Sequence, residues 1–250
     1  MRPFISRSMF FIGILAAWEV LARAFKIPLW LLPPPSAVWE TFVTTPLPYL
    51  AANTWVTLYE TLLGLAAGSV GGILMAIAVA HSSYLRSTLL PAIISFEAFP
   101  KIAIAPLIVV WLGLGIEAKI MMAFLIVFFP IMINTAAGLE KVEPELIDLA
   151  RVNSATTWQI LYEIRWPNAL PYVFEGLKIA VPLSLIGAII AEFVASRAGL
   201  GYIIVHSSAT LDTPLVFVAL VLLAFIALML YSCLIFVEGH VLKWHRRSAK

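Results

Sequence analysis

The chain has 250 residues, of which 62% are hydrophobic and only 12% are charged, with a formal net charge of +2. A soluble domain carries about 25% charged residues because its surface must stay hydrated. The composition therefore excludes a soluble globular protein and indicates one that is largely surrounded by lipid.

Motifs for catalysis, metal binding or nucleotide binding are absent from the sequence. The one cysteine, Cys233, lies within an apolar run, and the four histidines lack the spacing of a zinc site. No glycine is followed by lysine, so the phosphate-binding P-loop is missing. We expect no catalytic residue and no metal in this chain, and ATP, if it drives the protein, must bind another chain.

Apolar runs predict an all-α membrane protein with about six transmembrane helices, since a bilayer core needs about 20 apolar residues of helix. A count of five or seven also fits. In chain order the runs are Ser8–Phe25, Thr61–Ala80, Leu89–Leu114, Ile120–Leu139, Pro171–Ser196 and Thr213–Val237.

Between the first two spans, the stretch Ile27–Tyr49 is rich in proline. Proline removes backbone donors and stops helices, so we predict an ordered external loop or a re-entrant turn here. No domain boundary is visible. We expect one transmembrane domain over residues 1–250, with its core at about 54–240.

The second span carries small residues at every fourth position: Gly64, Gly68, Gly72, Ala76 and Ala80. This spacing makes a smooth stripe that another backbone can approach closely. The stripe predicts either packing within one subunit, which we favour, or an interface between subunits.

The distribution of basic residues places both termini in the cytoplasm. Basic flanks resist translocation, so they gather on the cytoplasmic side. With an even number of spans, the larger group is cytoplasmic: Arg2, Arg7, Arg86, Lys141, Arg151, Arg165, Lys243, Arg246, Arg247 and Lys250. The smaller group is external or within the membrane: Arg23, Lys26, Lys101, Lys119 and Arg197.

Residues 140–171 form the longest predicted cytoplasmic segment and read as two short helices. Pro144 suits the first turn of the first helix, where its missing donor is harmless. Asn153 and Ser154 interrupt the pattern, Thr156 then begins a second helix with a capping box to Gln159, and Pro167 is predicted to end it.

Two interpretations of this hairpin are open. It lies on the lipid surface, or it docks into a groove on a soluble partner. Helices that lie on lipid are usually basic on their polar face, whereas this segment is acidic: Glu140, Glu143, Glu145, Asp148 and Glu163 outnumber Lys141, Arg151 and Arg165. The acidity favours a protein partner.

The same segment resembles the EAA loop of ABC importer permeases, whose pattern is roughly E-A-A-x-x-x-G-A-S followed by a proline near the next span. Asp148 stands at the acid, Ala150 at the second alanine, and Pro171 at the final proline. Leu149 replaces the first alanine and Ser154 replaces the glycine, so we expect Asn153 to take the left-handed turn instead. The residues assigned to ATPase coupling are Asp148, Ala150, Arg151, Asn153, Ser154, Ala155, Thr156 and Trp158.

Further motifs extend the resemblance over nearly the whole chain, to the nitrate/sulfonate/taurine type of permease with a MetI-like fold. They are Leu32–Val38, Phe99–Leu107, Trp111–Gly115, Ala191-Glu192 and Gly199–Gly201. The resemblance implies a homodimer in the bacterial inner membrane, with cytoplasmic ABC ATPase subunits that bind ATP and Mg and an extracytoplasmic solute-binding protein. It implies no cofactor on this chain and no nucleic-acid partner.

The third span is interrupted by prolines and carries Glu97 and Lys101 beside Pro100. A lysine deep in a membrane costs about 2.5–3.5 kcal/mol, so it normally faces the protein interior. Glu97, Pro100 and Lys101 therefore either line the translocation path or its gate, or form a structural ion pair in which Glu97 or Glu192 is the acid. Ser184 and Glu192, on one face of the fifth span, are the next path candidates.

Other functional classes fit less well. An ion-gradient-driven secondary transporter is the alternative, but such chains often show two related halves, and no convincing repeat is present. Within the permease group, the Pro100–Ala103 and Leu211–Leu215 segments look more like permeases for vitamin precursors, such as thiamine pyrimidines or riboflavin, than for taurine.

Overall fold

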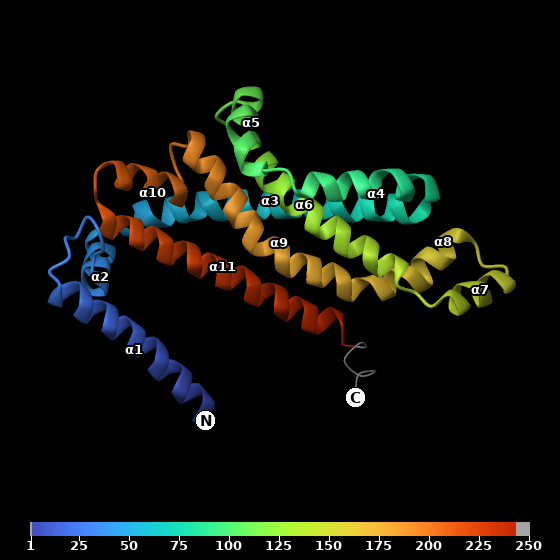
Figure 1. The fold of residues 1–250 in the computed structure, drawn as a ribbon, viewed down its shortest axis with the longest axis horizontal. Helices are drawn as coiled ribbons and strands as arrows, with labels where there is room; N and C mark the ends of the chain where they lie inside the picture. Colours follow the sequence, from blue (N-terminus) through green and yellow to red (C-terminus); the bar gives the residue numbers. More distant parts are fainter. Residues whose placement is uncertain (1, 244–250) are drawn as a thin grey trace. The chain divides into compact units, whose positions relative to one another are not determined.

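The computed structural model describes residues 2–243, except for the side chains of residues 2–8, 11, 83, 89, 90, 94 and 195. Every regular element in this range is a helix, which confirms the predicted all-α class (Figure 1). The elements are α1 (Arg2–Ala24), α2 (Pro35–Thr44), α3 (Leu47–His81), α4 (Ser83–Glu97), the 3-10 helix η1 (Lys101–Ile104), α5 (Ala105–Leu112), α6 (Ile116–Glu140), α7 (Pro144–Val152), α8 (Thr157–Gln159), the π-helix η2 (Ile160–Arg165), α9 (Trp166–Ala195), α10 (Leu200–Ala209) and α11 (Thr213–Val241).

Four helices are long and apolar enough to cross a membrane: α3, α6, α11 and the continuous helix Thr157–Val194. A fifth candidate is the pair Tyr84–Glu97 and Lys101–Leu112, which is bent by 82° at its break. The first predicted span coincides with α1, which is not among these candidates. A count of four or five is roughly consistent with the predicted six. Arg246, Arg247 and Lys250, which entered the orientation prediction, lie outside the described residues.

The chain forms two compact units, each built from segments far apart in sequence. The first unit combines Met1–Thr57 with Ser196–Phe225, and the second combines Leu58–Ala195 with Ile226–Lys250. Neither unit is a continuous stretch of chain, so no single linker separates them.

In the first unit, polar contacts join α1 to the start of α2. The Glu19 carboxylate forms an ion pair with Arg23 at 2.5 Å and accepts hydrogen bonds from the Ser36 amide at 3.0 Å and the Ser36 hydroxyl at 2.8 Å. Residues 27–49, predicted as an ordered external loop or a re-entrant turn, contain the short helix α2. Pro35 occupies the first turn of α2, where proline's missing donor costs nothing.

The start of α10 is held by side chains from the first turns of α3. The Gly199 amide donates to Asn53 Oδ1 at 2.7 Å, and the Leu200 amide donates to Thr57 Oγ1 at 2.8 Å. These bonds satisfy amides that a helix start leaves without partners. Gly199 has φ of +110°, a backbone conformation that residues other than glycine rarely adopt.

In the second unit, the small-residue stripe of α3 packs against α6 of the same chain. A Cβ added at Gly72 would lie 2.8 Å from the Phe128 carbonyl oxygen and 3.1 Å from the Met132 amide nitrogen, and one added at Gly68 would lie 2.7 Å from Val127 Cγ1. Packing within one subunit, the favoured interpretation of the stripe, is therefore what the structure shows for these glycines.

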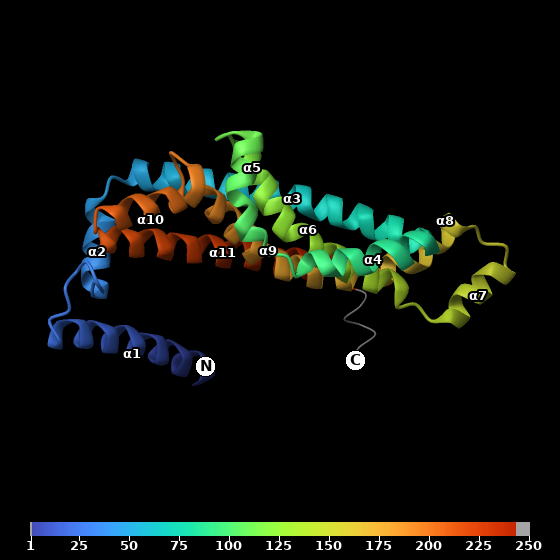
Figure 2. The same cartoon turned by 45° about the horizontal axis from the view of Figure 1, so that its top comes forward.

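Helices α6 and α9 approach each other closely in the same way. A Cβ added at Gly187 would lie 2.7 Å from Ala123 Cα, and one added at Gly138 would lie 2.9 Å from Ala169 Cα. Fully buried side chains such as Met122, Ile131 and Met132 fill this core. Beyond the ends of α6 and α9, α7 and α8 form a hairpin (Figures 1 and 2).

Candidate functional site

The hairpin of residues 140–171 is shaped by local hydrogen bonds, beginning with the turn after α7. Ser154 has φ of +61°, and its amide donates to the Arg151 carbonyl at 2.9 Å. The Ala155 amide donates to the Ala150 carbonyl at 3.0 Å. Together these bonds form a Schellman motif with Ser154 in the left-handed position.

The expectation that Asn153 takes this left-handed turn is therefore wrong. Asn153 has φ of −81°, and its side-chain amide donates to the Leu149 carbonyl at 2.8 Å. Ser154 stands where the EAA pattern has glycine, and it adopts the conformation that glycine prefers. The turn keeps its place in the chain, because the Schellman hydrogen bonds fix which residue must be left-handed.

The second hairpin helix begins as predicted and does not end as predicted. Thr156 Oγ1 accepts a hydrogen bond from the Gln159 amide at 3.3 Å, and Gln159 Oε1 accepts one from the Thr156 amide at 2.7 Å. This is a complete capping box.

Pro167, however, lies inside a continuous helix from Thr157 to Val194. The π-helical turn η2 precedes it, with the Trp166 amide donating to the Leu161 carbonyl. A π turn shifts hydrogen bonding by one residue and accommodates an irregularity without ending the helix. The hairpin is thus joined directly to α9.

Several large apolar side chains of the hairpin are exposed. The exposed fractions are 60% for Leu149, 83% for Val152, 67% for Trp158 and 75% for Tyr162. In contrast, Ile160 and Leu161 are buried. One part of the hairpin therefore packs against the rest of its own unit, and another part exposes apolar side chains.

The residues assigned to coupling lie around this exposed surface. Asp148, Arg151, Asn153, Ser154, Thr156 and Trp158 are exposed, and Ala150 and Ala155 are half-buried. Asp148 and Arg151 form an exposed ion pair at 3.3 Å. The Trp158 ring also stacks on His81, the last residue of α3, with 5.4 Å between ring centroids.

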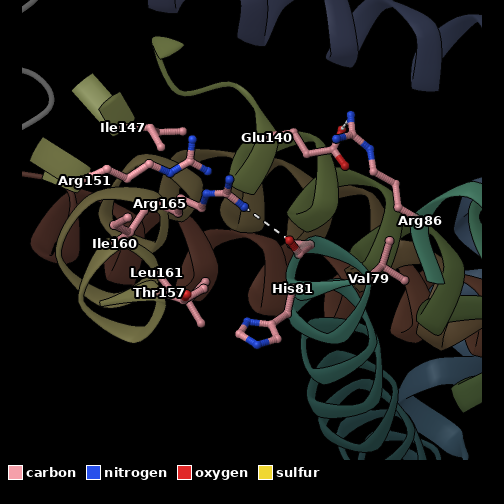
Figure 3. A pocket seen from close by; sticks show the side chains of 11 residues that line it. Val79, His81, Arg86, Glu140, Ile147, Arg151, Thr157, Ile160, Leu161 and Arg165 are labelled. Carbon is pink, nitrogen blue, oxygen red and sulfur yellow. Dashed lines mark hydrogen bonds and ion pairs between the residues drawn. The ribbon is translucent and has the colours of Figure 1, made fainter. Parts of the chain in front are cut away.

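A cavity of about 400 Å³ lies between the hairpin and the ends of α3, α4 and α6 (Figure 3). Arg165 donates to the Ala80 carbonyl at 3.2 Å, and Arg86 forms an ion pair with Glu140 at 2.7 Å. Arg151 also lines the cavity. Sequence reasoning did not identify this cavity, because its residues come from five separate helices.

The path candidates of the third span lie at its break. Lys101 forms an ion pair with Glu97 at 3.0 Å, and its ammonium group lies 4.6 Å from the centre of the Phe129 ring. Pro100 separates α4 from η1. The structure thus forms the Glu97–Lys101 ion pair that the sequence left open, at a bend between two helices.

The remaining path candidates, Ser184 and Glu192, are buried within the chain, with exposed fractions of 0% and 2%. Ser184 donates to the Val181 carbonyl at 2.7 Å. A second buried acid, Glu60, accepts a hydrogen bond from Lys119 at 2.6 Å. Glu60 and Lys119 each directly precede a predicted span, and the sequence did not indicate that they pair with each other.

A further ionic cluster was missed altogether: Lys178 of α9 donates to Glu238 at 2.8 Å and to Glu175 at 3.0 Å. Glu238 lies at the end of α11, 60 residues along the chain. Among the described residues, no three His, Cys, Asp or Glu side chains are grouped so that they could hold a metal ion.

Comparisons with known proteins agree with this architecture. Residues 68–246 match the family described as the binding-protein-dependent transport system inner membrane component. The chain is 35% identical over 232 residues to a probable ABC transporter permease protein of Haemophilus influenzae, covering 92% of this chain and 94% of the relative. It is 34% identical over 235 residues to the riboflavin transport system permease protein RibX of Chloroflexus aurantiacus, covering 92% and 87%.

Among solved structures, the chain is similar to one from the inward-facing MetNI methionine ABC transporter. The TM-score is 0.67 at 20% identity, and the match covers 80% of this chain and 98% of the other. This likeness supports the predicted MetI-like fold. Family and fold together favour a permease over the secondary transporter left open by the sequence. The chain belongs to the inner membrane components of binding-protein-dependent transport systems, and it is the permease subunit of an ABC importer.

Proposed function

We propose that the hairpin of residues 140–171 is the contact through which a separate ATPase subunit drives transport. The observation that carries the proposal is the exposure of Leu149, Val152, Trp158 and Tyr162 on an otherwise polar segment. Several large apolar side chains exposed on one short segment outside a membrane are typical of an interaction site. An ATPase subunit that covers these side chains would move them when ATP binding closes it.

The charge of the hairpin supports a protein partner over a lipid surface. Glu143, Glu145 and Asp148 are all exposed on or beside α7. Anionic lipid would repel these carboxylates, whereas helices that lie on membranes are usually basic. The coupling residues, from Asp148 to Trp158, are then the ones that the ATPase subunit contacts.

The rest of the assembly follows from this assignment. The hairpin and both termini lie in the cytoplasm, in agreement with the excess of basic residues there. Two copies of this chain form the permease dimer, each docking one ATPase subunit, and an extracytoplasmic binding protein delivers the solute. The ATPase subunits bind ATP and Mg, while this chain performs no chemistry and holds no cofactor.

For the solute path, we propose the bend in the third span, with Glu97, Pro100 and Lys101 at its gate. The Glu97–Lys101 ion pair lies where α4 gives way to η1, and a helix break is a natural hinge. Because Ser184 and Glu192 are buried, solute reaches them only when α3, α6 and α9 move apart.

The proposed solute is a small molecule of the vitamin-precursor class. The 34% identity to a riboflavin permease over nearly the whole chain supports this choice over taurine, as do the Pro100–Ala103 and Leu211–Leu215 segments. Uptake of labelled riboflavin and of thiamine pyrimidines, each competed with excess taurine, tests the assignment. Inhibition of these uptakes by excess taurine would contradict the assignment.

Co-purification with the ATPase subunit tests the docking proposal. We expect Trp158→Ala and Val152→Asp to reduce recovery of the ATPase about tenfold or more, since truncating a central interface aromatic commonly costs 2 kcal/mol or more. Trp111→Ala is the matched control, because Trp111 is 72% exposed but lies on α5. Equal recovery with both tryptophan variants would refute the docking site.

Uptake by Lys101→Ala tests the gate. We expect assembly to be normal and uptake to fall, because the variant removes the cation of the bend. Arg23→Ala is the control, since Arg23 also forms an i,i+4 pair with an acid but lies on α1. Unchanged uptake by Lys101→Ala would remove this residue from the path.

A further inference from the structure

The cavity beneath the hairpin has a charge pattern that ATPase docking does not explain. We propose that it binds a phosphate group carried by a small polar molecule with a neighbouring hydroxyl, such as a glycerol phosphate. This molecule is either soluble or the headgroup of an anionic phospholipid. The site does not involve the exposed apolar residues, although it shares Arg151 with the residues assigned to coupling.

Guanidinium groups dominate the cavity wall. Arg86, Arg151 and Arg165 line it together with Glu140, the one carboxylate of the described lining. Glu140 is paired with Arg86 at 2.7 Å, so the charges of Arg151 and Arg165 remain. Asp148 offsets Arg151 only weakly, because that pair is exposed and 3.3 Å long. The cavity therefore has a surplus of positive charge.

Two buried polar atoms of the cavity residues lack a hydrogen-bond partner within the described part of the chain. They are Nε of Arg165, a donor, and Oε1 of Glu140, an acceptor. Buried polar groups are nearly always hydrogen-bonded, so each such atom calls for an explanation. A ligand that carries both a phosphate oxygen and a hydroxyl satisfies the donor and the acceptor at once.

Arginine is suited to phosphate, since its planar guanidinium donates two parallel hydrogen bonds to an oxyanion. Figure 3 shows the side chains of Arg151 and Arg165 entering the cavity from the hairpin, and the Arg86–Glu140 pair facing them from other helices. The volume of about 400 Å³ lies within the usual range for small-ligand sites. A bound phosphate would join the hairpin to the ends of α4 and α6.

Such a ligand would restrict how far the hairpin moves relative to the spans. Arg151 lies on α7 and Arg165 on η2, so both arms of the hairpin contribute to the site. Phosphate bound between them would neutralise the repulsion of the two cations and hold both arms in place.

Binding to the purified full-length chain tests the proposal. In detergent, at constant ionic strength, glycerol 3-phosphate and inorganic phosphate are titrated and the rise in melting temperature is measured. In nanodiscs, retention of phosphatidylglycerol against phosphatidylcholine is measured by native mass spectrometry. A response to the soluble probes identifies a free phosphate compound, and selective retention of phosphatidylglycerol alone identifies a lipid headgroup.

Arg165→Gln and Arg151→Gln should weaken whichever binding is seen about tenfold or more, because each removes a charge-assisted hydrogen bond. Arg151 is exposed, so its variant remains informative should Arg165→Gln fail to fold. Lys243→Gln, which removes an exposed cation outside the cavity, is the control and should bind as the unaltered chain does. No response to any probe would overturn the proposal, and so would arginine variants that bind normally but lose the ATPase subunit.

Discussion

The hairpin and the α3–α6–α9 core belong to the same unit, yet the contacts that stabilise them differ in how far apart in sequence the bonded residues lie. The turn and the cap of the hairpin are fixed by hydrogen bonds between residues at most five positions apart, such as the capping box of Thr156 and Gln159, and only its base bonds to distant residues, as Arg165 does to the Ala80 carbonyl. The core is fixed by contacts between distant residues, such as the pair of Glu60 and Lys119, 59 positions apart. Glu60 and Lys119 are both buried in the core, while the hairpin exposes Val152 and Tyr162.

This contrast shows where a partner protein can act. The hairpin has turn and cap hydrogen bonds of its own and exposes Val152 and Tyr162. A rigid, locally stabilised element can transmit force from a partner without unfolding. We therefore expect substitutions in the core to change stability, and substitutions in the hairpin to act mainly through coupling.

The largest effect is expected for Glu60→Ala in the core. This substitution removes the Glu60 carboxylate, which accepts a hydrogen bond from the Lys119 ammonium group at 2.6 Å, and leaves the ammonium group buried. Breaking a buried ion pair by removing one partner costs about 3–5 kcal/mol. Unfolding of the purified protein in detergent measures the change.

Asp148→Ala is the matched control, because it removes the acid of an exposed pair and should cost less than about 1 kcal/mol. Equal destabilisation by the two variants would contradict the distinction between core and hairpin.

Next in size is Gly72→Ala at the α3–α6 contact. Its Cβ would lie 2.8 Å from the Phe128 carbonyl oxygen, so the two helices must move apart. Overpacking of this kind costs about 1–3 kcal/mol, measurable as a lower melting temperature. Gly13→Ala on α1 is the control, since its Cβ would have no neighbour within 4 Å. A stabilised Gly72→Ala protein would show that α3 and α6 are not closely packed.

Within the hairpin, Thr156→Ala should cost about 1 kcal/mol, the usual effect of losing an N-cap side chain. The loss is local, so we expect faster hydrogen exchange at the Gln159 amide, whose acceptor is Thr156 Oγ1. Thr157→Ala, one residue further on, keeps the cap and serves as the control. The same exchange rate in both variants would argue against the capping box.

The smallest change in stability is expected for Ser154→Gly, and it is an increase rather than a decrease. Ser154 has φ of +61°, a conformation that costs a residue with a side chain more free energy than it costs glycine, and glycine's larger loss of chain entropy on folding offsets part of that difference. The variant should therefore be slightly more stable in the same unfolding assay. Asn153→Gly should be less stable, because Asn153 has φ of −81° and gains nothing from glycine's freedom. Reversed signs would place the left-handed residue at Asn153.

Much of the fold could be predicted because its signals are local. Length and hydropathy located the membrane helices, and the spacing of Pro144, Thr156 and Gln159 located the hairpin. The end of the second hairpin helix was predicted wrongly. A π turn depends on which carbonyl each amide bonds to, whereas Pro167 shows only that one backbone donor is missing.

The sequence by itself determined the membrane class, the order of the helices and the caps of the hairpin, since each depends on residues within a few positions of one another. Only the tertiary structure decided that Glu60 meets Lys119, that Lys178 meets Glu238, and that Arg151 and Arg165 line one cavity. Periodicity shows which face of a helix a residue occupies, but it does not show which distant helix packs against that face.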